Sequence, residues 1–332
     1  MRRVASWLVT PLIVMLMVLL SSGSTVAQDR LATPTSPAPD QAELLWESAG
    51  DPDRPLAEPW FLSLDPDANL WVVDGRNNQF QIFAPDGTFL EAWGMAGTGK
   101  GEFDFVEHGA SAFDAEGNLY VVDTGNDRVQ KFGPDRDFLT AWGGEGSGDG
   151  QFLSPLDIAV TADGRVYVID DRRNDVQVFD RNGRFLFAFG GGEDSELGLA
   201  DTGGLTIDEV GNILVADYGN QRIVRFSPDG EQLASWGEAG TRAGELFAPI
   251  DLVVDEQGRV YVIDNSLHRV EVYDRDGHFL TQFGRAGMDV GQFYSVVSIA
   301  RDASGHLYLS DAGRNVVLAF RLEMPGEATP EP

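Results

Sequence analysis

The chain contains no cysteine, only two lysines (Lys100 and Lys131) and only four histidines among its 332 residues. Without cysteine there is no disulfide, no thiolate nucleophile and no thiolate metal site. Basic side chains are scarce, so the formal net charge is -29. A surface this acidic repels phosphate backbones, because nucleic-acid affinity depends on basic side chains that neutralise phosphates. We therefore expect no nucleic-acid partner.

The first 27 residues have the features of a secretory signal peptide. Arg2-Arg3 forms a basic start, an apolar run extends from Trp7 to Leu20, and Thr25-Val26-Ala27 forms a small-residue cleavage site. The apolar run is shorter than the roughly 20 residues that span a bilayer. We predict that the segment 1–27 is cleaved and that the protein is secreted or extracytoplasmic. It then contacts a membrane only if the segment remains uncleaved.

Two further segments, 28–42 and 323–332, are rich in proline and poor in large apolar residues. Such segments cannot bury enough apolar surface to become ordered. We predict a disordered linker and a disordered tail, with one folded domain over 43–322.

Six aspartates recur along this domain, with a first interval of 49 residues and four intervals of 47. They are Asp74, Asp123, Asp170, Asp217, Asp264 and Asp311. Nine residues after each comes an aromatic residue: Phe83, Phe132, Phe179, Phe226, Tyr273 and Phe320. A period near 45 residues without helical segments is typical of a β-propeller.

Each repeat contains four short predicted strands, which are clearest in the third repeat at 157–161, 166–170, 176–180 and 185–190. The second strand, Val166-Tyr167-Val168-Ile169, is apolar at odd and even positions alike. Both faces of its sheet must therefore be covered, as in a blade that packs between two neighbouring blades.

The two ends of the domain predict how the ring closes. The sixth repeat stops near Leu322 without a fourth strand. Glu43-Leu44-Leu45-Trp46 lies one period before Leu90-Glu91-Ala92-Trp93 and matches it. We predict an all-β fold, a six-bladed β-propeller of four-stranded antiparallel blades, closed by the N-terminal strand that completes the last blade. One large aromatic per blade is expected to pack in the core: Trp46, Trp93, Trp142, Phe189, Trp236 and Phe283.

The recurring pattern Gly-x-[Val/Leu]-Tyr-Val-x-Asp, followed by Asn-x-Arg-Val and Phe, resembles the NHL repeat family. Residues 117–132 resemble the family pattern almost throughout, and the resemblance covers about 43–322. It implies a six-bladed propeller. Family members include RNA-binding proteins, extracellular sensor domains of bacterial kinases and a zinc-dependent peptidyl-hydroxyglycine amidating lyase, and the fold does not choose among them.

Most features that resemble chemistry have a structural interpretation. The six repeated aspartates are expected to cap backbone amides in the turns that follow the second strands. Of the four histidines, His108 and His268 are predicted on one face of opposite blades, and His278 and His306 on the other face. Three histidines in such places do not converge on a zinc ion, which disfavours an amidating lyase.

Two acids depart from the repeat at one register of the first strands. The six blades carry Phe61, Ala110, Asp157, Gly204, Asp251 and Ser298 there. We expect Asp157 and Asp251 to lie near the channel mouth, where they could bind calcium weakly at most, or a hydroxylated ligand. The alternative is that both acids are simply solvated at the surface. No other cofactor is predicted.

The loop from Gly94 to Gly109 is two residues longer than its counterparts. We predict that Phe105, Glu107 and His108 in this loop bind a partner, because loop variation on a rigid scaffold is where binding usually resides. The alternative is that Phe105 folds inward to fill the wider loop. Phenylalanines at similar places after a glycine in four of the blades are expected to be buried: Phe103, Phe152, Phe247 and Phe293.

Every repeated residue thus has a packing or turn role, and no nucleophile, base and oxyanion group occur together. We predict a monomeric, exported, non-enzymatic scaffold that binds a protein, peptide or glycan through the face that carries the inter-blade loops. The alternative is a metal-dependent propeller enzyme, either lactonase-like or, with less support, similar to the amidating lyase.

Overall fold

The computed structural model describes residues 42–105, 108–191 and 198–324. In these ranges the regular secondary structure consists of β-strands and two single-turn 3-10 helices, η1 (Gly75–Asn77) and η2 (Thr124–Asn126), joined by turns and loops. None of the described helices is long and apolar enough to cross a bilayer.

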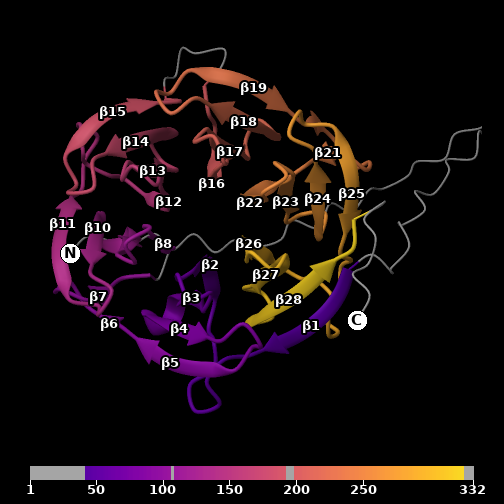
Figure 1. The fold of residues 1–332 in the computed structure, drawn as a ribbon, viewed down its shortest axis with the longest axis horizontal. Helices are drawn as coiled ribbons and strands as arrows, with labels where there is room; N and C mark the ends of the chain where they lie inside the picture. Colours follow the sequence, from indigo (N-terminus) through magenta and orange to yellow (C-terminus); the bar gives the residue numbers. More distant parts are fainter. Residues whose placement is uncertain (1–41, 106–107, 192–197, 325–332) are drawn as a thin grey trace, which may run out of the picture. The chain divides into compact units, whose positions relative to one another are not determined.

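Six four-stranded antiparallel sheets form a ring of blades, numbered here in chain order (Figure 1). Blade 1 contains, from the axis outward, β2 (Pro59–Leu64), β3 (Leu70–Asp74), β4 (Gln79–Phe83) and β5 (Phe89–Trp93). Blade 2 contains β8 (Ala110–Phe113), β9 (Leu119–Asp123), β10 (Arg128–Phe132) and β11 (Phe138–Gly143). Blade 3 contains β12 (Pro155–Val160), β13 (Val166–Asp170), β14 (Asp175–Phe179) and β15 (Phe185–Phe189).

Blades 4 to 6 repeat this order. Blade 4 contains β16 (Thr202–Ile207), β17 (Ile213–Asp217), β18 (Arg222–Phe226) and β19 (Gln232–Trp236). Blade 5 contains β22 (Pro249–Val254), β23 (Val260–Asp264), β24 (Arg269–Tyr273) and β25 (Phe279–Phe283). Blade 6 contains β26 (Val296–Arg301), β27 (His306–Asp311), β28 (Val316–Leu322) and β1 (Ala42–Ser48). Two short parallel pairs lie in inter-blade loops, β6 (Met95–Ala96) with β7 (Glu102–Phe103) and β20 (Glu238–Ala239) with β21 (Glu245–Leu246).

The ring closes as the sequence predicts. The first described strand, β1, pairs antiparallel with β28, and Trp46 lies opposite Ala319. Because the two strands come from opposite ends of the domain, their pairing ties the chain ends together and covers an edge that would otherwise be exposed. The six-bladed propeller and its closure are confirmed.

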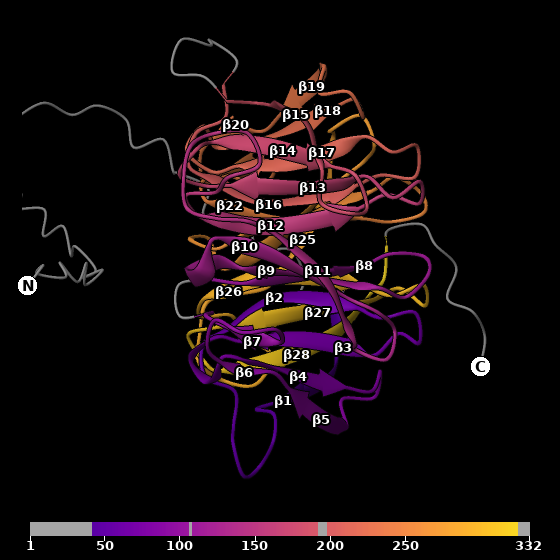
Figure 2. The ribbon, with the colours of Figure 1, turned by 90° about the vertical axis from the view of Figure 1, so that its left-hand side faces the viewer.

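The ring has two faces. The hairpins between second and third strands and the inter-blade loops lie on one face, here called the loop face. The turns that join first to second and third to fourth strands lie on the opposite face, the turn face. Figure 2, a view of the ring from its side, shows inner strands such as β2 and β12 running along the ring axis. Ala42 pairs with Leu322 at the end of β28, so β1 begins on the turn face.

The core lies within and between the blades. The second strands are buried along their whole length, as in Val166–Asp170, because neighbouring blades cover both of their faces. The blade-end aromatics pack on the next blade: a Cβ on Gly183 would lie 2.4 Å from the Trp142 ring. Gly183 has φ +83°, so glycine suits this turn for its backbone as well as for its size.

Candidate functional site

The six repeated aspartates are fully buried and bind backbone amides. Asp170 accepts hydrogen bonds from the N–H groups of Leu153 (2.7 Å) and Ser154 (3.1 Å) in the preceding inter-blade loop, and from Arg173 (3.1 Å) in its own hairpin. The expected backbone cap in the hairpin is present at Asp170, Asp264 and Asp311, whereas Asp74, Asp123 and Asp217 accept a hydrogen bond from the side chain of a hairpin asparagine instead. At Asp170, two of the three bonds reach back 16 or 17 residues. The equivalent aspartates make the same loop contact in the other blades, so their role is to tie each inter-blade loop to its blade.

Asp157 and Asp251 lie in a layer of side chains around the ring axis, and each reaches the next blade. Asp157 Oδ2 accepts the N–H of Leu205 (2.8 Å), and Asp251 Oδ2 accepts the N–H of Ile299 (2.9 Å) and the hydroxyl of Ser298 (2.7 Å). Inner strands have no further strand on their axial side, so these N–H groups need another acceptor. The two acids therefore link neighbouring blades. They are buried, which contradicts the alternative that they are solvated at the surface.

Gly204, on the blade between them, allows the two acids to approach each other. A Cβ on Gly204 would lie 2.2 Å from Asp251 Oδ1 and 3.1 Å from Asp157 Oδ2. Burial raises the pKa of Asp251 to about 7, and burial together with the charge of Asp251 raises the pKa of Asp157. Their hydrogen-bond donors are amides and one hydroxyl, and no described lysine or arginine forms an ion pair with either acid.

A cavity of about 300 Å³ on the ring axis is lined by inner-strand residues of all six blades. The residues at the loop-face side of this lining, such as Asp157 and Asp251, are buried, whereas the last two residues of β2, β8, β12, β16 and β22 are partly exposed. The cavity therefore opens toward the turn face. The sequence predicted that the two acids lie near the channel mouth, but they lie at the inner end of the cavity.

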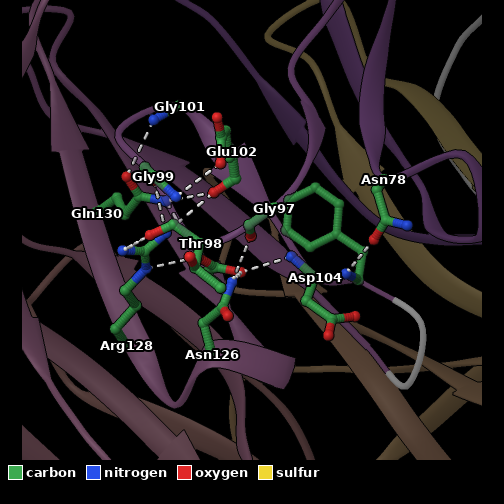
Figure 3. Close-up of polar contacts among 12 residues, drawn as sticks. Asn78, Gly97, Thr98, Gly99, Gly101, Glu102, Asp104, Asn126, Arg128 and Gln130 are labelled. Carbon is green, nitrogen blue, oxygen red and sulfur yellow. Dashed lines mark hydrogen bonds and ion pairs between the residues drawn. The ribbon is translucent and has the colours of Figure 1, made fainter.

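The described part of the longer loop, 94–105, is bound tightly to its own blade (Figure 3). Arg128 donates hydrogen bonds to the backbone carbonyls of Thr98 (2.8 Å), Gly99 (2.8 Å) and Glu102 (3.0 Å). Asn126 donates to the carbonyl of Gly97 (3.0 Å). With so many backbone groups already paired, this part of the loop has few free groups for a partner.

Phe105 fills the interior of this loop. Its ring is fully buried, stacks on Phe103 at 4.9 Å and contacts Phe80 edge-on at 5.4 Å, while its N–H donates to Asn78 Oδ1 (2.6 Å). In this structure the ring packs inward, which is the alternative to partner binding. Glu107 lies outside the described residues.

His108 is half-buried beside Trp60, with ring centroids 4.7 Å apart. Burial lowers the pKa of His108 to about 4, so the imidazole is neutral at pH 7. The other histidines lie elsewhere: His268 in a hairpin of the loop face, and His278 and His306 on the turn face. Within the described ranges, three histidines do not converge on a zinc site.

One group of three metal-type ligands occurs in the described part of the chain. It consists of Asp274, Asp276 and His278 in an exposed turn of the turn face. Asp274 Oδ1 already accepts the N–H groups of Asp276 and His278, both at 2.9 Å, as in an ordinary turn. We assign this group to turn formation.

Three aromatic side chains on adjacent blades of the loop face are exposed instead: Tyr218 (42%), Phe247 (47%) and Tyr294 (53%). Phe247 was expected to be buried like Phe103, and that prediction is wrong. Leu246 holds the buried position in this blade, and Phe247 is the next residue, at the register of the exposed Tyr294. The signal in the sequence was the spacing from the glycine: Leu246 is the second residue after Gly244, as Phe103 is after Gly101.

No protein-family model matches the chain, and no curated protein matches it. Among solved structures it is similar to a streptogramin B lyase (TM-score 0.60, 11% identity, 87% of this chain and 100% of that chain). It is also similar to a virginiamycin B lyase from Staphylococcus aureus (TM-score 0.57, 11% identity, 86% and 90%). A third similar structure is a gluconolactonase from Xanthomonas campestris (TM-score 0.62, 18% identity, 85% and 89%). At these identities the likeness shows the propeller fold alone.

Proposed function

We propose that this chain is an exported propeller of the NHL type that acts as a non-enzymatic binding module. Its partner is a protein, peptide or glycan of the cell envelope or the extracellular space, and it binds on the loop face. The observation that carries the proposal is the set of exposed aromatics on blades 4 to 6, Tyr218, Phe247 and Tyr294. Aromatic side chains supply large contact areas at low entropic cost and are enriched among interface hot spots.

The backbone at Phe247 and Tyr294 is hydrogen-bonded to buried aspartates. The N–H of Phe247 donates to Asp264 (2.7 Å) and the N–H of Tyr294 donates to Asp311 (2.8 Å). Both acceptors are fully buried, so each aromatic projects from a fixed backbone position. A preorganised surface loses less entropy when a partner binds.

The positions of the start of β1 and the end of β28 also favour the loop face as the partner surface. β1 begins and β28 ends on the turn face, so the described chain enters and leaves the domain on the side opposite the aromatics. A tether attached there leaves the loop face accessible to a partner.

The metal-dependent enzyme alternative rests on the axial acids Asp157 and Asp251. Their oxygens already accept hydrogen bonds from neighbouring blades, and the described residues place no histidine beside them. The fold likeness to a lyase and a gluconolactonase does not transfer an activity.

Two assays on the same purified protein separate these functions. One measures capture of envelope proteins, peptides and glycans on the immobilised protein, and the other measures turnover of lactones and peptidyl-hydroxyglycines with and without a chelator. We expect saturable capture and no turnover. Turnover that a chelator abolishes, without saturable capture, would establish the enzyme class instead.

A further inference from the structure

The axial cavity combines an acidic inner end with walls that contain apolar patches among polar residues. Its inner end presents the carboxyl groups of Asp157 and Asp251. Toward the turn face its walls carry the apolar residues Leu64, Phe113, Val160 and Ile207 beside the polar residues Ser63, Ser111, Thr206 and Arg301. This arrangement suits a ligand with one polar end and one apolar end.

The charge of the two acids is not balanced by the protein. Five neutral donors hydrogen-bond their oxygens, but hydrogen bonds from amides and hydroxyls do not cancel a negative charge. Arg301 is the one cationic residue among those lining the cavity, and it pairs with Glu256 at 2.7 Å. An ionised carboxylate that is buried without a cationic partner is costly, and this cost raises the pKa of both acids. An ammonium group between them would stabilise their ionised forms, which a neutral or anionic group cannot do.

The geometry points to a site for a small organic cation, with its ammonium group between Asp157 and Asp251 and its apolar body against the walls at Phe113, Val160 and Ile207. A volume of about 300 Å³ fits a compact ligand and excludes a folded peptide or a long glycan. The cavity opens to the turn face, so this site is separate from the proposed partner surface and does not depend on it.

A pair of probes of equal shape tests the role of charge. Calorimetry at pH 8 on the full chain compares 2-phenylethylammonium with 2-phenylethanol, which lacks the charge. We expect the ammonium to bind at least tenfold more tightly than the alcohol. Equal affinities, or no binding of the ammonium, would show that the inference is wrong.

Two variants locate the binding. Asp157→Asn combined with Asp251→Asn keeps the side-chain shape and removes the charge, and should weaken ammonium binding at least tenfold. Ala159→Leu fills part of the cavity without changing either acid, and should also weaken it. Asp276→Asn, at an exposed acid of the turn face, is the matched control and should bind like the wild type.

The cavity variant also protects the test against a folding defect. An asparagine can place an NH₂ group opposite a backbone N–H that the aspartate oxygen accepted, and this would destabilise the fold. The melting temperature of the double variant is therefore measured first. If that variant does not fold, Ala159→Leu decides, and unchanged ammonium binding in it overturns the inference.

Calcium provides the last arm of the experiment. Calcium that binds the wild type and displaces the ammonium in proportion to its occupancy would make the axial acids a metal site and contradict the inference. Unchanged ammonium binding at millimolar calcium supports it.

Discussion

The loop 94–109 and the loop 237–248 occupy equivalent places in blades 2 and 5 and use their aromatics in opposite ways. The first is two residues longer, and its Phe105 is fully buried. The second has the usual length, and its Phe247 is 47% exposed. Both loops carry a short parallel strand pair, β6 with β7 and β20 with β21. The longer loop therefore adds a buried ring, Phe105, to the core. The loop of ordinary length instead exposes a ring, Phe247, at the surface.

Truncating the buried ring should have the largest effect on stability. Phe105→Ala removes a ring that stacks on Phe103 and contacts Phe80, and we expect a loss of about 4 kcal/mol in the free energy of unfolding. Phe247→Ala should change it by less than about 0.5 kcal/mol, since the ring is exposed. Urea denaturation of both variants measures the difference. Equal losses would mean that the two rings are equally buried in solution.

Removing the acceptor under the exposed ring should have the next largest effect. Asp264 accepts the N–H groups of Phe247, Ala248 and Leu267. Asp264→Ala leaves one buried and two partly buried donors without this partner, and we expect a loss of about 3 kcal/mol in the free energy of unfolding. Asp86→Ala, at an exposed turn where Asp86 accepts the N–H of Thr88, is the control and should cost under about 1 kcal/mol.

The histidine of the longer loop should make stability depend on pH. The pKa of His108 is about 4 when folded, below its ordinary value of 6.5, because burial disfavours the charged ring. As pH falls, the imidazole of the unfolded chain therefore binds a proton at a higher pH than the imidazole of the folded chain. The stabilisation of the folded state by neutral His108 is complete above pH 6.5 and is lost between pH 6.5 and pH 4. At pH 5 the loss is about 2 kcal/mol.

The matching variant is His108→Thr, which introduces the residue found at the equivalent place in blade 4. We expect its stability to fall less steeply than that of the wild type between pH 8 and pH 5. Parallel pH profiles for the two proteins would show that His108 is solvated in both states.

The repeat predicted the ring well because the same contacts are needed in every blade. The spacing of Asp170 and its equivalents predicted six blades. The match of residues 43–46 to residues 90–93 predicted that the N-terminal strand closes the ring. The register of Phe247 was assigned one residue too far, because the aromatic side chain was matched instead of the period. Leu246 lies 47 residues before Phe293, so the period itself places Leu246 in the buried position.

The axial site was predicted only in part. The sequence singled out Asp157 and Asp251 because they depart from the repeat. Their burial, their bonds to Leu205 and Ile299, and their approach across Gly204 depend on how blades face one another. Contacts between residues almost 50 positions apart leave no local pattern in the chain.

The most direct test of the proposed recognition surface compares exposed apolar residues at different places on the ring. The test variant is Phe247→Ala with Tyr294→Ala on the loop face. The controls are Val210→Ala on the turn face and Leu233→Ala on the outer strand β19, whose side chains are also exposed. Capture of the bound partner and melting temperature are measured for all three proteins. We predict that capture falls at least tenfold in the loop-face variant alone, with unchanged melting temperatures. Full capture by that variant, or an equal loss in Val210→Ala, would contradict recognition on the loop face.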